Sequence, residues 1–210
     1  MAVSTPRLPR LIVLTDWTLP EERHRSALEA LARLGPEVCL QHRDPGAPVR
    51  TFLERARWLA EVTRLGGAQL AINGRLDVAL LVGAHLHLPV EAPRPREARA
   101  QLPPDRWISA AVHSTAELHE AAGADAFLVS PVHAPGSKPG DSRPPLGADG
   151  FERLARAAAP VPCFALGGMT PECTLALRSR WGIAIQSGVM RALDPVAAAR
   201  AFLEALVSPD

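Results

Sequence analysis

The chain has 210 residues, 47% of them hydrophobic and 21% charged, which is close to the average for globular proteins. Its 23 Lys and Arg nearly balance its 22 Asp and Glu, which excludes the basic surface typical of proteins that bind nucleic acids or acidic membranes. No apolar stretch approaches the roughly 18 residues of a membrane span, and the first one is too short for a secretion signal. We therefore expect a cytoplasmic protein that acts on small molecules, without nucleic-acid or membrane partners.

Strand and helix patterns alternate along the chain. Short aliphatic runs predict strands, and apolar residues three or four positions apart predict helices that end at Gly or Pro. In chain order the pattern reads strand 11–14, helix 21–34, strand 37–41, helix 49–65, strand 68–72, helix 76–82, strand 85–88, helix 95–102, strand 107–112, helix 114–122, strand 126–130, helix 151–159, strand 163–166, helix 171–179, strand 182–186 and helix 195–207.

Eight strands that are apolar almost throughout predict a parallel sheet buried on both faces. The strict alternation favours an α/β fold, a single-domain (β/α)8 TIM barrel over residues 11–207, preceded by an N-terminal extension, residues 1–10. An open doubly wound sheet is the alternative. It would call for a glycine-rich phosphate loop after the first strand, where Thr15-Asp16-Trp17-Thr18 stands instead.

In a TIM barrel the active site lies at the carboxyl ends of the strands, so the residues that end each predicted strand are the first candidates. These are Asp16, Gln41, His42, Arg43, Asn73, Arg75, His87, His113, Ser130, His133, Gly167, Gly168, Ser187 and Gly188. Tyrosine is absent, so a proton-transferring group must be a histidine, a carboxylate, a lysine or a cysteine. Cys39, Cys163 and Cys173 show no paired spacing, which argues for buried thiols and against disulfides or a zinc site.

The last two strand ends predict a phosphate site. Two glycine-containing loops follow these strands, and each is followed by a helix start. Their residues are Gly167, Gly168, Ser187 and Gly188, and glycines there let backbone N–H groups approach an anion. TIM barrels commonly hold a phosphate at these two loops. Two ordinary glycine-rich turns are the simpler alternative.

Six motifs, in order and at matching spacing, resemble the thiamine-phosphate synthase and thiazole tautomerase family. They are Gln41-His42-Arg43-Asp44, Ile72-Asn73-Gly74-Arg75-Leu76-Asp77, Val112-His113-Ser114, Ser130-Pro131-Val132-His133 with Lys138, Ala165-Leu166-Gly167-Gly168-Met169-Thr170-Pro171 and Ile185-Gln186-Ser187-Gly188. The resemblance runs over nearly the whole chain. It implies a TIM barrel, a phosphorylated thiazole ligand, a role in making thiamine, and a homodimer.

Within that family, two acidic motifs of the synthase branch are altered. The resemblance implies Asn-Asp-Arg after the third strand and Gly-Gln-x-Asp after the fourth, whose acids hold Mg²⁺; here Gly74 and residues 89–92 stand there, and Glu91 is the nearby carboxylate. A lysine expected after the second strand is replaced by Pro45. We therefore expect the tautomerase branch, with no metal or cofactor, and Mg²⁺ only if the chain is a synthase.

A thiazole tautomerase moves a proton between two carbons, which requires a group that gives and accepts protons near neutral pH. The resemblance assigns this acid/base role to His113, and histidine has a suitable pKa near 6.5. A histidine that only caps the following helix is the alternative. His133, at the end of the sixth strand, is a second acid/base and substrate-binding candidate.

Cationic and polar side chains at the same end are candidates for binding the substrate. Arg43 can pair with a carboxylate, and Arg75 or Lys138 with a carboxylate or a phosphate. Lys138 lies in a polar loop, residues 133–146, that could close over the site. The remaining candidates are neutral side chains that share the same end of the barrel: Gln41, Asn73 and His87.

Other histidines support weaker alternatives. His85 and His87 with His113 could form a three-histidine metal site, although His85 fits better near the other end of the barrel. His24 and His119 fall on helices, where we expect them exposed, and Trp17 could line the site or pack in the core. Three further functions stay open: a thiamine-phosphate synthase, a non-catalytic regulator that binds thiamine or thiazole phosphate, and a phosphosugar isomerase.

Overall fold

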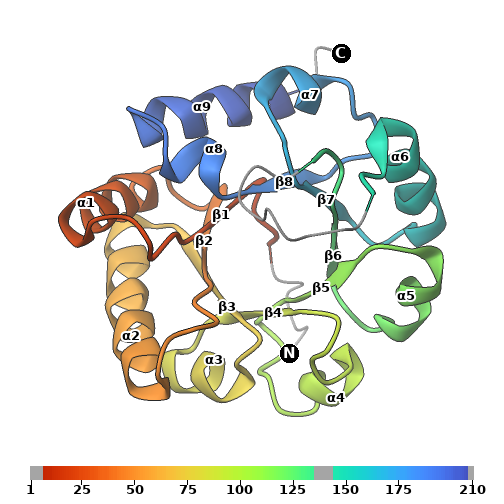
Figure 1. Ribbon diagram of the computed structural model, residues 1–210. Coiled ribbons are helices and arrows are strands. Elements are labelled where there is room, and N and C mark those ends of the chain that lie inside the picture. Colours follow the sequence, from red (N-terminus) through yellow and green to blue (C-terminus); the bar gives the residue numbers. More distant parts are fainter. Residues whose placement is uncertain (1–6, 135–143, 208–210) are drawn as a thin grey trace.

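A computed structural model describes residues 7–134 and 144–207. Eight parallel strands form a closed barrel in which each strand bonds to the next in sequence and β8 bonds to β1. The helices surround the barrel on its outside (Figure 1). The predicted TIM-barrel fold is confirmed.

The strands agree closely with the predicted ones, because each is a short run of buried apolar residues. They are β1 (Leu11–Leu14), β2 (Val38–His42), β3 (Gln69–Asn73), β4 (His85–Leu88), β5 (Ile108–Val112), β6 (Ala126–Val129), β7 (Cys163–Leu166) and β8 (Gly182–Ile185). Successive side chains alternate between two cores. Ile12 packs inside the barrel with Cys39 and Phe164, whereas Leu11 and Val13 pack outward against the helices.

Most helices lie close to the predicted ranges. The helices are α1 (Glu21–Ala32), α2 (Val49–Gly66), α3 (Leu76–Val82), α4 (Pro95–Arg99), α5 (Thr115–Glu120), α6 (Gly147–Ala158), α7 (Pro171–Leu175), α8 (Ser187–Met190) and α9 (Pro195–Leu206). Two predicted bounds are wrong: α6 begins at Gly147 instead of residue 151, and α7 ends at Leu175 instead of residue 179. The Asp194 carboxylate caps α9 by accepting the Val196 and Ala197 amides, each at 2.9 Å. The sequence did not predict α8, because four residues are too short for a helical pattern to show.

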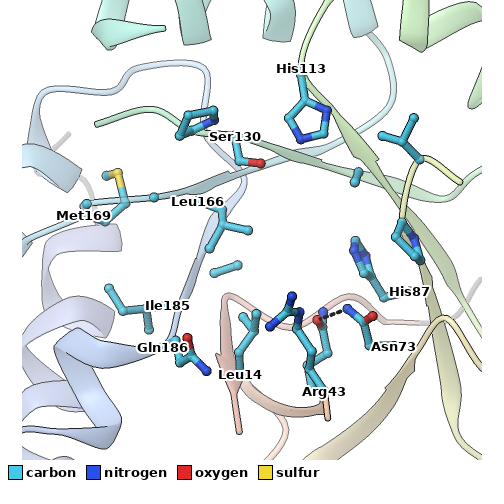
Figure 2. A pocket seen from close by; sticks show the side chains of 18 of the residues that line it. Leu14, Arg43, Asn73, His87, His113, Ser130, Leu166, Met169, Ile185 and Gln186 are labelled. Carbon is cyan, nitrogen blue, oxygen red and sulfur yellow. Dashed lines mark hydrogen bonds between the residues drawn. The ribbon is translucent and has the colours of Figure 1, made fainter. Parts of the chain in front are cut away.

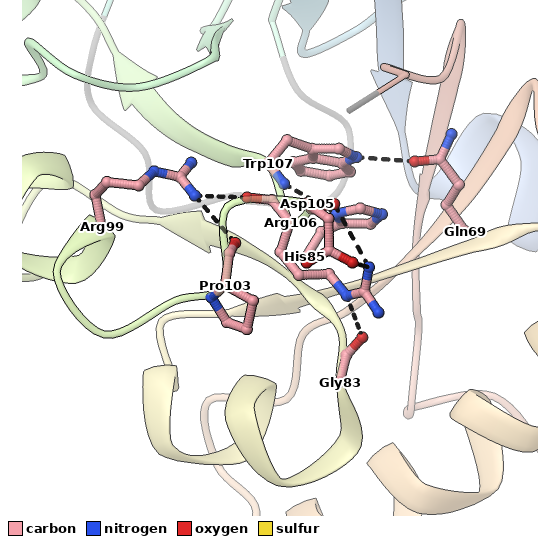
Figure 3. A network of polar contacts seen from close by, with 8 residues as sticks. All are labelled: Gln69, Gly83, His85, Arg99, Pro103, Asp105, Arg106 and Trp107. Carbon is pink, nitrogen blue, oxygen red and sulfur yellow. Dashed lines mark hydrogen bonds and ion pairs between the residues drawn. The ribbon is translucent and has the colours of Figure 1, made fainter. Parts of the chain in front are cut away.

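The amino-terminal end of the barrel is closed by a polar network around Trp107 (Figure 3). The fully buried Trp107 ring stacks on His85 with 4.4 Å between ring centroids, and its Nε1 donates to Gln69 Oε1 at 2.8 Å. Burial, with the nearby charge of Arg106, lowers the pKa of His85 to about 3, so this histidine is neutral. As expected, His85 is structural, and ligands must enter from the opposite end.

Two side chains near β1, His24 and Trp17, bear on earlier predictions. His24 on α1 was predicted to be exposed, which is wrong: it is 1% exposed and its ring lies 4.2 Å from that of Trp17. His24 is buried together with Ala27, Leu28 and Leu31, because the face of α1 that carries these residues packs onto the barrel. Trp17 donates its Nε1 hydrogen to His42 Nδ1 at 3.1 Å and packs against the outer core, so it belongs to the core.

Within the described residues, no helix is long and apolar enough to cross a membrane.

Candidate active site

A cavity of about 730 Å³ opens at the carboxyl ends of the strands (Figure 2). Most of the predicted site residues line it. Those that do are Gln41, Arg43, Asn73, His87, His113, Ser130, Gly167, Gly168, Ser187 and Gly188. Residues far apart in the sequence meet here because the carboxyl ends of parallel strands share one end of the barrel.

Four predicted residues within the described part of the chain do not line this cavity: Asp16, His42, Arg75 and His133. The Arg75 guanidinium turns to Asp77, donating through Nε at 2.9 Å and Nη2 at 2.6 Å, and it does not line the cavity. His133 is half-buried beside the Gly168 turn and also lies outside the lining. Lys138 falls outside the described residues. The charge partner of Arg75 is two residues away in sequence, so local pairing explains its orientation.

One wall of the cavity is built from neutral polar groups on β2, β3 and β4. Asn73 Nδ2 donates to Gln41 Oε1 at 3.0 Å, and His87 Nδ1 lies 2.9 Å from Ser109 Oγ. Gln41 Nε2 is buried and has no hydrogen-bond partner, which leaves a donor beside the cavity for a ligand to satisfy. Burial, together with the positive charge of Arg43, lowers the pKa of His87 to about 3. His87 is therefore a neutral hydrogen-bonding group.

Arg43 supplies a positive charge to the cavity. It follows β2, and its backbone N–H donates to Thr15 Oγ1 at 3.0 Å, while Thr15 Oγ1 donates back to the Arg43 carbonyl at 3.1 Å. These two bonds fix the backbone from which the side chain extends. Figure 2 shows the guanidinium projecting into the cavity, where it can bind a phosphate or carboxylate through two hydrogen bonds.

His113 enters the cavity from the end of β5, held by Glu117. The Glu117 Oε2 atom accepts both the His113 Nδ1 hydrogen at 2.8 Å and the His113 backbone N–H at 2.7 Å. Because Glu117 is a carboxylate, it fixes the proton on Nδ1, and Nε2 is then the atom available to a ligand. Glu117 also lines the cavity and was missed in the sequence. Its spacing of four residues from His113 was the available signal.

The β7 and β8 turns form the wall opposite β3 and β4. Gly167 and Gly168 have φ angles of +101° and +58°, in the left-handed region that favours glycine. A Cβ at Gly168 would come within 2.7 Å of the Ala134 carbonyl oxygen and of His133 Cβ, so the turn has no room for a side chain. Gly167 and Gly168 line the cavity, and without side chains they let an anion approach the backbone there.

Further lining residues were not predicted, because their types carry no chemical signal. They are Leu14, Pro45, Pro89, Val90, Ala111, Pro131, Leu166, Met169, Ala184 and Ile185. Together they give the cavity an apolar part beside its polar wall, as small-molecule sites usually have. The three-histidine metal site is not formed: His85 lies at the other end of the barrel, and the described residues contain no group of three potential metal ligands.

Comparison with known proteins identifies close relatives. Residues 11–189 match the thiamine monophosphate synthase family. The thiamine-phosphate synthase of Methanoculleus marisnigri is 36% identical over 203 residues, which cover 94% of this chain and 95% of the relative. The thiamine-phosphate synthase of Chloroflexus aurantiacus is 36% identical over 210 residues, covering 95% and 93%. A solved structure, thiamine phosphate pyrophosphorylase from Pyrococcus furiosus, is similar with a TM-score of 0.79 and 29% identity, covering 94% of this chain and 95% of that one.

These relatives correct the expected activity. A thiazole tautomerase was predicted, whereas the two relatives are named thiamine-phosphate synthases and the solved structure a thiamine phosphate pyrophosphorylase, which contradicts that prediction. The prediction gave the changes at Gly74 and at residues 89–92 more weight than the likeness of the remaining chain. Since the family match covers most of the barrel, the chain belongs to the thiamine monophosphate synthase family.

Proposed function

We propose that this protein is a thiamine-phosphate synthase, a transferase that joins a pyrimidine carrying a diphosphate to a thiazole phosphate. The observation that carries the proposal is the 36% identity to synthases over 94% of the chain. In this reaction the thiazole ring nitrogen attacks the methylene carbon of the pyrimidine. A carbon–nitrogen bond forms, the carbon–oxygen bond to the diphosphate breaks, and the diphosphate leaves with the electron pair.

The two walls of the cavity suit the two ends of such a ligand pair. The unpartnered Gln41 Nε2 would donate to a nitrogen of a heteroaromatic ring, and Asn73 keeps the Gln41 amide in place through its hydrogen bond. The open backbone at the Gly167–Gly168 turn would receive the thiazole phosphate. Arg43 would neutralise part of the phosphate or diphosphate charge.

His113 would serve as a hydrogen-bonding group to the substrates. The coupling transfers no proton to or from carbon, so it does not need the acid/base role expected of His113 in a tautomerase. With Nδ1 bonded to Glu117, the Nε2 atom can bond a substrate oxygen or ring nitrogen at a fixed position. Fixing two substrates for reaction is itself a large part of catalysis, because it removes the entropy cost of bringing them together.

The described lining residues do not fit a magnesium site built by the protein. Magnesium prefers carboxylate and phosphate oxygens in octahedral geometry. Of the two carboxylates that line the cavity, Glu117 Oε2 already accepts two hydrogen bonds from His113, which leaves Glu91 on the exposed rim. The described residues hold no group of three potential ligands.

A coupling assay tests the proposed function. The purified chain is incubated with the pyrimidine diphosphate and thiazole phosphate, with and without Mg²⁺, and both thiamine phosphate and released diphosphate are measured. We expect the two products in equal amounts. Absence of thiamine phosphate under both conditions would refute the proposal.

Two arginine variants make the assay specific to this cavity. Arg43→Ala removes the cavity guanidinium and should lower kcat/KM by roughly 10- to 1,000-fold, since a bidentate pair to a phosphate is lost. Arg75→Ala removes the same charge outside the cavity, where the side chain pairs with Asp77, and should change kcat/KM less than about twofold. Equal losses in the two variants would contradict the proposed cavity.

A further inference from the structure

Asp16, at the end of β1, is a buried carboxylate that does not line the cavity. It is 4% exposed, and its Oδ2 accepts from Arg191 Nε at 2.9 Å. Its Oδ1 accepts from Thr18 Oγ1 at 2.5 Å and from the Thr18 amide at 3.3 Å. Burial alone would raise the pKa of Asp16, but the hydrogen bonds from Thr18 and Arg191 outweigh it and hold the pKa below its usual value. A buried, fully engaged carboxylate calls for an explanation, because charged groups are costly to bury.

Its partner Arg191 directly follows α8, the short helix after β8. Through the Asp16–Arg191 ion pair, the carboxyl end of α8 is attached to β1. The Arg191 carbonyl also accepts from Arg23 Nη2 of α1 at 3.3 Å. Four residues cannot hold a helix by themselves, so the position of α8 depends on such tertiary contacts.

The other end of α8 is attached to the same loop. Gln186 immediately precedes α8, and its Nε2 donates to the Thr15 carbonyl at 2.9 Å. Thr15 and Asp16 are adjacent, so one corner of the barrel holds α8 at both ends. Gln186, Ser187 and Gly188 line the cavity. A shift of α8 would therefore move a wall of the proposed site.

We propose that Asp16 is a positioning residue for the phosphorylated thiazole: through Arg191 it fixes the segment from Gln186 to Gly188 that forms one wall of the cavity. The inference rests on the proposed function for the identity of this ligand. Asp16 acts through Arg191 without touching the substrate, so its loss weakens binding and leaves the coupling chemistry largely intact.

The test is a double-mutant cycle with Asp16→Asn and Arg191→Met. The dissociation constant for thiazole phosphate is measured by calorimetry, and kcat and KM by the coupling assay. Asp16→Asn should weaken binding roughly 10-fold, because displacing a binding wall by a fraction of an ångström misaligns its contacts, and kcat should stay within about twofold. Arg191→Met should have a similar effect, and the double variant should be no weaker than the worse single one, since both break one interaction.

Amide hydrogen exchange gives a second readout. Exchange at Val189 and Met190, whose amides donate to the Gln186 carbonyl at 3.2 and 2.8 Å, should rise in both variants. A purely stabilising ion pair would raise exchange throughout the barrel instead.

Asp125→Asn is the matched control. Asp125 pairs with Arg99 at 2.5 Å and accepts from the Ile108 amide at 2.7 Å, near the start of β5 and so at the other end of the barrel. This variant should lower the unfolding temperature without weakening binding of thiazole phosphate.

Three results would overturn the inference: unchanged affinity in Asp16→Asn, additive losses in the double variant, or an equal loss of affinity in Asp125→Asn. Absence of thiazole phosphate binding by the parent chain would also overturn it. If the parent binds thiazole phosphate but forms no thiamine phosphate, the proposed function fails. In that case the affinity measurements still decide the role of Asp16.

Discussion

Replacing Gly168 by alanine tests whether the β7 turn forms the phosphate wall. The φ angle of Gly168 is +58°, and for an alanine this left-handed conformation costs roughly 1–2 kcal/mol. The added Cβ would also lie 2.7 Å from the Ala134 carbonyl oxygen and 3.0 Å from the His133 carbonyl carbon. Because these contacts are largely backbone, the turn and the 133–134 segment must move apart, at a further cost of roughly 1–3 kcal/mol.

Gly83→Ala separates the two costs. Gly83 has a φ angle of +65° at the end of α3, and a Cβ there would meet nothing within 4 Å. This control should lose roughly 1–2 kcal/mol of unfolding free energy and keep its affinity for thiazole phosphate. Gly168→Ala should lose roughly 2–5 kcal/mol and at least about tenfold in kcat/KM, because the turn moves relative to the cavity.

Urea unfolding followed by circular dichroism gives the free energies, and the coupling assay gives kcat/KM. For both variants kcat/KM is measured without urea, at a temperature at which each variant is folded. Equal stability losses in the two variants, with unchanged kcat/KM in Gly168→Ala, would show that neither the clash nor the turn matters as argued.

Other predictions concern the histidines and the closed end of the barrel. Burial lowers the pKa of His24 to about 4, so the unfolded state, with a pKa near 6.5, binds the proton first; the unfolding free energy should fall as pH drops from about 6.5 to about 4, by up to about 1.4 kcal/mol per pH unit for this group. His24→Leu removes two buried, unpartnered ring nitrogens and should make this pH dependence shallower without lowering stability at pH 7, while the buried His85 and His87 keep a remaining slope; an unchanged pH profile would contradict it. Trp107→Phe loses the bond to Gln69 and part of its packing, so urea unfolding should show a loss of roughly 1–3 kcal/mol with unchanged kcat/KM. Glu117→Gln keeps a hydrogen-bond acceptor for His113 but no charge, and should lower kcat/KM less than His113→Ala does; the reverse order would refute the positioning role of Glu117.

The correction of the activity shows how local motifs can mislead. Gly74 and residues 89–92 depart from the acidic motifs expected of a synthase, and those departures concern a metal site. They do not report on the other walls of the cavity, where the polar wall, the glycine turns and Arg43 were predicted and do line the site. The identity of the chain over its whole length, which sums many weak signals, points to the synthases.

The sequence by itself determined the barrel and most of its strand-end residues. Buried parallel strands require continuous apolar runs, and glycines and prolines between them mark the ends, so both signals are local and readable. The same rule predicted that Gln41, Asn73, His87 and His113 lie at one end of the barrel.

Tertiary structure alone decided which charged side chains face the cavity and which groups hold them. Arg43 and Arg75 both follow the end of a predicted strand, yet Arg43 lines the cavity and Arg75 pairs with Asp77. The burial of His24 and the Asp16–Arg191 pair, 175 positions apart, likewise left no local pattern. A long side chain can reach several partners, and its choice depends on distances that exist only once the barrel has closed.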